Sequence, residues 1–304
     1  MASVLDRLAG GPISWGVCEV PGWGAELPPD RVLAEMRELG ITATEAGPDG
    51  YLGADATSVR ALLERHGLEL VGGFLPVVLH ERDAHDESLA SAEHVATLFS
   101  ETGAAFLVSA VVGDLSWPPR FDLTEVQWRC VFEGLARLDD LAASHGLTHV
   151  THPHWRTLVE RRDDVWRVLE ASDVLLCLDT GHLALGGTDP VEVAREGGDR
   201  IAHVHLKDVD EALASRLRAG EVELVTAVQA GLFRPLGDGG APVEETVRTL
   251  EESGYAGWYV LEQDCALASA DIPEGAGPIE EVRRSVDFLQ SLAGDPLSTA
   301  RGGR

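Results

Sequence analysis

The sequence predicts an α/β protein built as a single (β/α)8 barrel, or TIM barrel. Three observations support this fold class: a unit of amphipathic helix, glycine and apolar strand recurs, eight such strands can be recognised, and the composition does not change between them. The alternative, a doubly wound open sheet, normally carries GxGxxG or GxxxxGK after its first strand, and neither motif is present there. We therefore expect a barrel domain over residues 1–293 and a disordered tail over residues 294–304.

The predicted strands are short apolar segments that end in polar residues. They lie at residues 10–17, 41–47, 68–77, 104–113, 147–154, 173–182, 200–208 and 255–264. In the sixth, five apolar residues from Val174 to Leu178 lead directly into Asp179. This pattern is typical of a parallel strand that is buried on both faces.

The predicted helices alternate with the strands. They lie at residues 30–40, 58–67, 88–103, 126–146, 165–172, 189–199, 245–254 and 279–293. The helix at 126–146 repeats apolar side chains at helical spacing, namely Trp128, Val131, Leu135, Leu138 and Leu141. Glycines that fit a left-handed cap end four of the helices: Gly40, Gly67, Gly103 and Gly146.

A long segment separates the seventh and eighth strands. It runs from about Asp208 to Gly240 and contains a helical pattern (EALASRLRAG, then LVTAVQAGLF) followed by RPLGDGG. Because ordinary connections in compact domains are much shorter, we expect this insertion to form a lid or an interface.

Composition excludes several classes of function. The chain has 51 acidic and 24 basic residues, a net charge of −27, which repels nucleic acid and anionic membranes. No apolar run reaches the length of a membrane span, and MASVLDRLAGG does not resemble a secretory signal. The four cysteines (Cys18, Cys130, Cys177 and Cys265) form no CxxC pair. We expect reduced thiols that fill the core, and a cytoplasmic location.

Polar side chains gather where the predicted strands end. They are Glu45, His152, His154, Asp179, His182, His203, His205, Lys207, Asp208, Glu262 and Asp264. In a barrel, the carboxyl ends of the strands meet at one mouth, where catalysis takes place. Imidazole and carboxylate ligands suit a divalent first-row metal (Mn, Co, Fe or Zn) better than Ca. Because side chains alternate along a strand, only the histidine nearer the mouth in each of the pairs His152/His154 and His203/His205 can reach the metal.

Several motifs together resemble the xylose isomerase-like TIM-barrel superfamily, and within it the inosose dehydratase branch. They are HPHWRTLVE, LCLDTGHLALGG, HVHLKD, PLGDGG and GYAGWYVLEQD, and the resemblance extends over roughly residues 10–290. It implies that Asp179, His205 and Glu262 are metal ligands, with His152 as the fourth. For Asp179, the alternative is a capping role at the next helix.

Two departures from the family pattern bear on the reaction. Sugar epimerases of the superfamily have Glu-Pro where this chain has His152-Pro153. The missing glutamate argues against a two-glutamate epimerase mechanism. Dehydratase-like sequences usually read HPHxGT, whereas here Arg156 replaces the glycine and adds a cation near the rim.

The resemblance implies chemistry at the carbon next to a ketone. A bound metal, Mn or Co by first expectation with Mg, Fe or Zn as alternatives, would polarise the ketone of a cyclic polyol or keto sugar. Glu262 is the first candidate base, and His154, His182 and Lys207 are unranked candidates for acid, base and oxyanion partner. Predicted substrate contacts are Glu45, Trp15 and Arg156.

Four functions remain open from the sequence. The first is an inosose dehydratase-like lyase that eliminates water. The others are a keto-sugar isomerase or epimerase, a lyase that cleaves 3-oxo C-glycosides, and a non-catalytic polyol-binding barrel. A homodimer is also expected.

Overall fold

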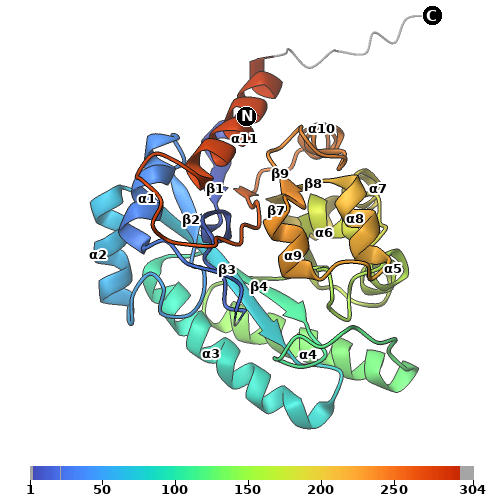
Figure 1. Cartoon of the computed structure of the whole chain (residues 1–304). Helices are drawn as coiled ribbons and strands as arrows, with labels where there is room; N and C mark the ends of the chain where they lie inside the picture. The colour runs from blue at the N-terminus through green and yellow to red at the C-terminus, as the bar shows by residue number, and fades with distance from the viewer. Residues whose placement is uncertain (1–2, 21, 295–304) are drawn as a thin grey trace, which may run out of the picture.

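Eight parallel strands close into a barrel, and helices lie around it (Figure 1). The order of the strands is β1, β10, β7, β6, β5, β4, β3, β2. The computed structural model describes residues 3–20 and 22–294. The barrel strands are β1 (Leu8–Gly10), β2 (Ala43–Glu45), β3 (Glu69–Val77), β4 (Phe106–Val111), β5 (Thr148–Thr151), β6 (Leu175–Asp179), β7 (Ile201–Leu206) and β10 (Tyr259–Leu261). The predicted (β/α)8 barrel is confirmed. The predicted tail, residues 294–304, lies outside the described residues except for Gly294.

Helices surround the barrel and connect its strands. They are α1 (Pro29–Glu38), α2 (Ala56–His66), α3 (His85–Thr102), α4 (Glu125–Ser144), α5 (Arg162–Ala171), α6 (Thr180–Leu185), α7 (Pro190–Gly197), α10 (Val243–Ser253) and α11 (Pro278–Gly294). Short 3-10 helices occur at η1 (Val4–Arg7), η2 (Pro12–Trp15), η3 (Arg82–Ala84) and η4 (Gly198–Arg200). Within the described ranges, no helix is both long and apolar enough to cross a membrane.

Local sequence signals account for the helix boundaries. Thr124 begins α4 with a capping box, in which its side chain and that of Gln127 bond to each other's backbone N–H groups. The four predicted capping glycines all have positive φ, as Gly67 does after α2 with a φ of 63°. The apolar face of α4 is buried as predicted, apart from Leu141, which is half-buried.

The predicted first strand is wrong in its position. It was expected at residues 10–17, but β1 spans Leu8–Gly10 and the 3-10 helix η2 follows it. Pro12 has no N–H to donate to a neighbouring strand and instead begins this helix, and Gly16, with a φ of 85°, ends it. The chain therefore turns over the barrel end where an extended strand was predicted.

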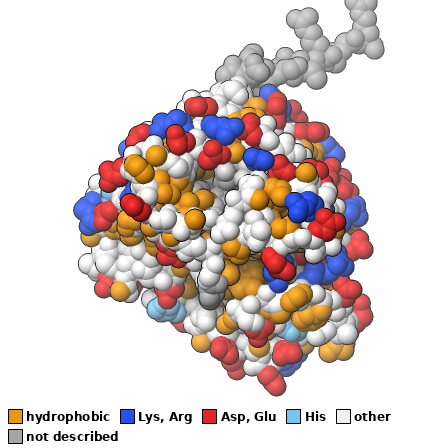
Figure 2. Space-filling view, viewed as in Figure 1, with side chains coloured by type: hydrophobic (Ala, Val, Ile, Leu, Met, Phe, Trp, Pro, Cys, Tyr) orange, Lys and Arg blue, Asp and Glu red, His pale blue; other side chains and the backbone are white. Residues whose placement is uncertain are grey.

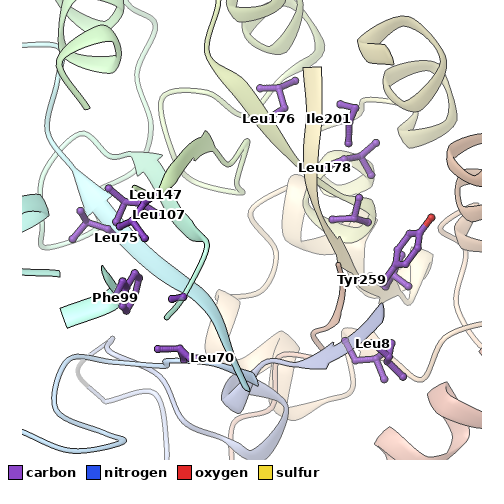
Figure 3. Close-up of a cluster of buried hydrophobic side chains, with 14 of the residues drawn as sticks. Leu8, Leu70, Leu75, Phe99, Leu107, Leu147, Leu176, Leu178, Ile201 and Tyr259 are labelled. Atoms are coloured by element: carbon purple, nitrogen blue, oxygen red, sulfur yellow. The ribbon is translucent and has the colours of Figure 1, made fainter. Parts of the chain in front are cut away.

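The core has two layers. Large aliphatic and aromatic side chains fill the space between strands and helices, among them Leu75, Phe99, Leu107, Leu176 and Tyr259 (Figure 3). Inside the barrel the side chains are smaller: Ala9, Ala43, Val71 and Val260 form one cluster, and Val108, Val150 and Cys177 form another. This apolar interior supports the polar residues at the mouth.

The insertion after β7 folds as a small unit of its own. It contains β8 (Asp208–Val209), α8 (Glu211–Arg218), α9 (Leu224–Gln229) and β9 (Phe233–Arg234), with β8 and β9 paired antiparallel. Its apolar side chains pack with Trp23 and Leu185 in a separate cluster. The predicted long insertion with helical content is confirmed, and it lies beside α6 (Figure 1).

Candidate metal centre at the barrel mouth

Four predicted ligands converge at the carboxyl ends of β5, β6, β7 and β10. Asp179 on β6 is in register with His205 on β7, which is in register with Val260 on β10. The Asp179 Oδ2 atom lies 3.4 Å from His152 Nε2 and 3.8 Å from His205 Nδ1. His205 Nδ1 also lies 3.1 Å from Glu262 Oε2. The strand register thus brings two imidazoles and two carboxylates to one point.

Three of these four atoms lack a hydrogen-bond partner among the described residues. His152 Nε2, Asp179 Oδ2 and His205 Nδ1 are all buried and unpaired. Buried polar atoms are rarely left unpaired, since each one loses its bonds to water. A divalent cation between these atoms would pair all of them, and both imidazole and carboxylate are good ligands for first-row metals. The residues therefore fit a divalent metal.

Asp179 both caps a helix and faces the centre. Its Oδ1 atom accepts hydrogen bonds from the backbone N–H groups of Gly181 and His182, both at 2.8 Å, at the start of α6. Its Oδ2 atom remains free. The two alternatives for this residue, helix cap and metal ligand, are therefore compatible. Burial opposes ionisation, but Lys207 and His152 outweigh it and lower the pKa of Asp179 to about 2.

Glu45, for which a substrate contact was predicted, lines the cavity and also contacts His203 and His205. Its Oε1 atom is 2.8 Å from His203 Nε2 and 3.1 Å from His205 Nε2. Burial opposes ionisation, but His205 and His203 hold the pKa of Glu45 at about 2. The carboxylate therefore accepts the Nε2–H of His205, which leaves the Nδ1 lone pair directed at Asp179 and Glu262. A carboxylate that accepts the second ring N–H of a metal-binding histidine fixes the tautomer of that histidine.

Lys207 is a buried cation held by several acids. Its Nζ atom lies 2.6 Å from Asp264 Oδ1 and 3.2 Å from Glu262 Oε2. It also lies 3.0 Å from His182 Nε2. Burial opposes the charge, but Asp264 and Asp179 outweigh it, so the pKa of Lys207 is raised. The neighbouring Asp208 does not pair with Lys207 but accepts backbone N–H groups from the 237–241 loop.

His182 and His154 are neutral and lie close together. Their ring centroids are 3.6 Å apart. Burial and the neighbouring His154 and Lys207 lower the pKa of His182 well below its usual value. Because its Nε2 accepts from Lys207, its proton is on Nδ1, which has no partner within the described chain. Burial lowers the pKa of His154 to about 3, and its Nδ1 donates to the Trp155 carbonyl at 2.7 Å, which leaves Nε2 as the acceptor.

A cavity of about 420 Å³ opens above these residues. Its lining includes the predicted residues Glu45, His152, His154, Arg156, His182, His205, Lys207 and Glu262. Hydrophobic side chains gather around the hollow near the centre of the face shown in Figure 2. Cys18 also lines the cavity, so core filling does not describe all four cysteines, which are free thiols.

Trp15, predicted to form an apolar floor for the substrate, does not line the cavity. It is fully buried, and its indole N–H donates to Glu35 Oε2 at 2.7 Å. The predicted substrate contact is wrong because η2 replaces the expected strand and turns the indole away from the mouth.

Arg156 lies on the cavity rim in an unusual backbone conformation. Its φ is 67°, in the left-handed region that favours glycine. Its guanidinium donates to the carbonyl of Trp117, another residue with positive φ (54°), at 3.4 Å. The glycine of the family pattern therefore corresponds to a real conformational requirement, which this chain meets with an arginine.

Two residues of the site, Phe74 and Trp117, were not selected from the sequence, and Asp264 was placed at the mouth without a role. Asp264 follows Glu262 by two positions, and the alternation of strand side chains was the signal that could have given it one. Phe74 and Trp117 form an aromatic wall beside His154, with ring centroids 5.8 Å and 5.5 Å from its own. Nothing in the spacing of these two residues distinguishes them from packing residues.

Residues 33–292 match the family described as xylose isomerase-like TIM barrel. The chain belongs to this family. Among curated relatives, an inosose dehydratase of Geobacillus kaustophilus is 35% identical over 276 residues, which cover 86% of this chain and 89% of the relative.

Solved structures of the xylose isomerase-like barrel confirm the fold. The IolI protein with a bound zinc atom matches with a TM-score of 0.70 at 15% identity, covering 94% of this chain and 98% of that one. A D-allulose 3-epimerase from a Methylomonas species matches with a TM-score of 0.68 at 14% identity, covering 94% and 97%. At these identities the likeness supports the fold alone.

Proposed function

We propose that this chain is a divalent-metal-dependent lyase that removes water from an inosose-like cyclic keto-polyol. The observation that carries the proposal is the group of unpaired atoms of His152, Asp179 and His205 beside Glu262 and Lys207. The similarity to inosose dehydratases over most of the chain supports the substrate class.

We assign four residues to the metal: His152, Asp179, His205 and Glu262. When bound, the ion would supply Lewis acidity that polarises the substrate ketone and acidifies the adjacent C–H group. Manganese or cobalt remains our first expectation, with Mg, Fe or Zn as alternatives. Burial lowers the pKa of His205, but Cys177, Glu262 and Glu45 outweigh it and raise the pKa, and the negative charge of the two carboxylates would also favour a metal cation beside this ring.

His154 is our candidate for the base that removes the α-proton. Its Nε2 lone pair is unprotonated at neutral pH, and no described residue bonds to that atom. Glu262, the first candidate from the sequence, has its Oε2 atom within reach of both His205 and Lys207. Burial opposes its ionisation, but His205 and Lys207 lower the pKa of Glu262 well below its usual value. Because these two contacts already engage its Oε2 atom, Glu262 is the weaker candidate, and we assign it to the metal.

Lys207 and His182 are placed to protonate the leaving hydroxyl. As the α C–H bond breaks, its electron pair forms the new C=C bond and the β C–O bond breaks. The hydroxyl leaves as water with the Nδ1 proton of His182, while His182 Nε2 receives a proton from the Lys207 ammonium 3.0 Å away. A neutral histidine between a cation and the substrate can relay a proton without becoming an imidazolate.

The cavity lining favours an uncharged substrate. Its acidic residues are Glu19, Glu45, Asp49, Glu223, Glu262 and Asp264, whereas its cations are Arg156 and Lys207. This excess of negative charge disfavours a phosphorylated sugar. The keto-sugar epimerase alternative has less support, because His152 occupies the position of the second glutamate.

The test combines metal analysis with one activity assay. Purified protein is analysed for bound metal by mass spectrometry and incubated with scyllo-inosose (2-keto-myo-inositol). We expect a conjugated enol-dione product that is lost with EDTA and restored by Mn or Co. Bound metal without turnover would overturn the dehydratase assignment in favour of an epimerase or a C-glycoside lyase. Neither metal nor turnover would favour a binding protein.

The base assignment has its own test. His154→Gln should retain the metal and lose both turnover and exchange of the substrate α-proton in D2O. Full exchange in His154→Gln, with loss of exchange in metal-loaded Glu262→Gln, would return the role of base to Glu262.

A further inference from the structure

The cavity at the barrel mouth has two chemically different ends. Side chains at the carboxyl ends of β5, β6, β7 and β10 line one end. Those that we assign to the metal or to proton transfer are all titratable. The other end extends under the β2–α2 loop, towards α2 and α3. We call this second end the apolar lobe, and its lining from β3, α2 and α3 is Leu70, Phe74, Leu75, Pro76, Val59, Val95, Leu98 and Phe99.

Each of the side chains that β3, α2 and α3 contribute to the lining is apolar, as far as the described residues show. Leu52 from the β2–α2 loop adds a further apolar group, and Asp49 on the same loop is the acidic exception. A sugar hydroxyl in this lobe would lose its hydrogen bonds to water without replacement, which is unfavourable. An alkyl or aryl group has no hydrogen bonds to lose, and its transfer from water to this apolar surface is favourable.

The lobe is continuous with the metal centre. Phe74, which lines the lobe, also reaches the other end, because its ring centroid lies 6.0 Å from that of His152 and 5.8 Å from that of His154. Phe74, Val95 and Leu98 are half-buried, so part of each side chain faces the cavity. A cavity of about 420 Å³ is within the usual range for small-molecule sites, about 300–1,000 Å³.

We propose that the substrate carries an apolar substituent that occupies this lobe while its keto-polyol ring lies at the metal centre. The substrate class is thus a cyclic keto-polyol ether or glycoside with an alkyl or aryl group. This inference rests on the proposed function for its reacting end, and it adds the chemistry of the opposite end. A substrate without the substituent would leave the apolar side chains of α2 and α3 that line the lobe in contact with water.

Turnover provides the first test. Scyllo-inosose is compared with its propyl and benzyl ethers, substituted at the hydroxyl farthest from the ketone, using metal-loaded protein. We expect kcat/KM for the benzyl ether to exceed that of the parent at least tenfold, because a few apolar carbons in a hydrophobic pocket change kcat/KM by roughly 10–200-fold. Equal or lower kcat/KM for both ethers would overturn the inference while leaving the proposed function intact.

Two variants on α3 localise the effect. Leu98→Trp fills the lobe and should reduce the benzyl-to-parent ratio to about one. Leu89→Trp is the matched control, because Leu89 is also half-buried on α3 but does not line the cavity. Its ratio should equal that of the unsubstituted protein. A ratio that stays high in folded Leu98→Trp would place the substituent elsewhere and contradict the proposal.

A binding measurement decides the question even if no ketone reacts. Myo-inositol and its benzyl ether cannot undergo the elimination, so calorimetry with them reports the lobe independently of catalysis. We expect the benzyl ether to bind at least tenfold more tightly, with a more negative heat-capacity change, which is the signature of apolar burial. If no ketone turns over but the ether binds in this way, the proposed reaction fails and the lobe assignment stands. Equal affinity would overturn the lobe assignment.

Discussion

At the residue scale, the centre depends on side chains whose two polar atoms have different tasks. Asp179 caps α6 with one oxygen and presents the other to the centre. His205 bonds to Glu45 through Nε2 and faces Glu262 through Nδ1. Each such residue is oriented by the fold before any ion binds, which lowers the cost of forming the site.

Glycines make room for this arrangement at two close approaches. A Cβ atom on Gly181 would lie 2.7 Å from Lys207 Cγ, and one on Gly11 would lie 2.8 Å from Glu262 Cγ. Both distances are shorter than van der Waals contact allows. The stems of Lys207 and Glu262 can therefore reach the mouth only because these neighbours lack side chains.

Neutralising Glu45 should weaken metal binding without removing a ligand. In Glu45→Gln, the charge that fixes the His205 tautomer is lost, and outer-shell changes of this kind typically cost about 10–100-fold in metal affinity. Competition with a fluorescent chelator measures the affinity. Glu35→Gln is the control, because Glu35 is a buried carboxylate that bonds to Trp15 and Arg31. Equal metal affinity in Glu45→Gln and wild type would remove Glu45 from the site.

The backbone at Arg156 predicts an unusual order of stability. A non-glycine residue in the left-handed region costs about 1–2 kcal/mol, and glycine avoids most of this cost. Arg156→Gly should therefore be about 1 kcal/mol more stable to urea unfolding than Arg156→Ala. At Arg162, the first residue of helix α5, the order should reverse, since glycine is the poorer helix former. The same order at both positions would show that Arg156 is not strained.

At the element scale, the insertion after β7 depends on acidic caps. Asp208 accepts the backbone N–H groups of Gly237, Gly239 and Ala241, and so closes the loop that follows β9. Asp210 caps α8 through Leu213 N–H at 3.0 Å and pairs with Arg234 on β9 at 2.8 Å. These two residues connect the start of the insertion to its end.

The charge of Asp210 predicts how the insertion responds to acid. The Leu213 N–H and Arg234 lower the pKa of Asp210 in the folded state. Its contribution is therefore present above the unfolded pKa of about 3.9 and is lost as the pH falls through the lower folded value. Amide-exchange protection factors in α8 should decrease across this range in the wild type. Asp210→Asn keeps the cap without the charge, so it should show no such step, and an unchanged step would assign the effect to another group.

The sequence was informative about the elements and less so about their contacts. Helical spacing and capping glycines located the helices, and the polar residues at the strand ends located the mouth. The position of β1 was wrong, because the apolar letters of PISW fit a strand although Pro12 begins a 3-10 helix. Phe74 and Trp117 could not be selected, because their roles depend on which segments meet across the barrel.

At the scale of the whole molecule, the acidic residues act differently at the surface and at the barrel mouth. The net charge of −27 belongs mostly to the surface, where most ion pairs are exposed and each contributes little. At the mouth, acidic side chains also outnumber cations, but several of them are buried, where water screens their charge less. They therefore attract a divalent cation more strongly than surface carboxylates do. A cytoplasmic location, a homodimer and the absence of nucleic-acid partners stay predictions.

Metal binding should therefore couple to the stability of the whole barrel. An ion that binds the native state alone stabilises it by about 2.7 kcal/mol at a hundredfold excess over Kd. With an unfolding entropy of about 2.1 cal/mol/K per residue for 304 residues, this corresponds to a rise in Tm of about 4 °C. Scanning calorimetry of EDTA-treated protein, with and without Mn or Co, measures the shift.

The variants Asp179→Asn and His205→Gln locate this coupling at the mouth. Each removes one ligand from a set contributed by four strands, so each should abolish most of the metal-dependent rise in Tm. His66→Gln, which removes a surface histidine that pairs with Asp30, should keep the full rise. If both ligand variants also kept it, the stabilising ion would bind elsewhere, and the unpaired atoms of His152, Asp179 and His205 would need another partner.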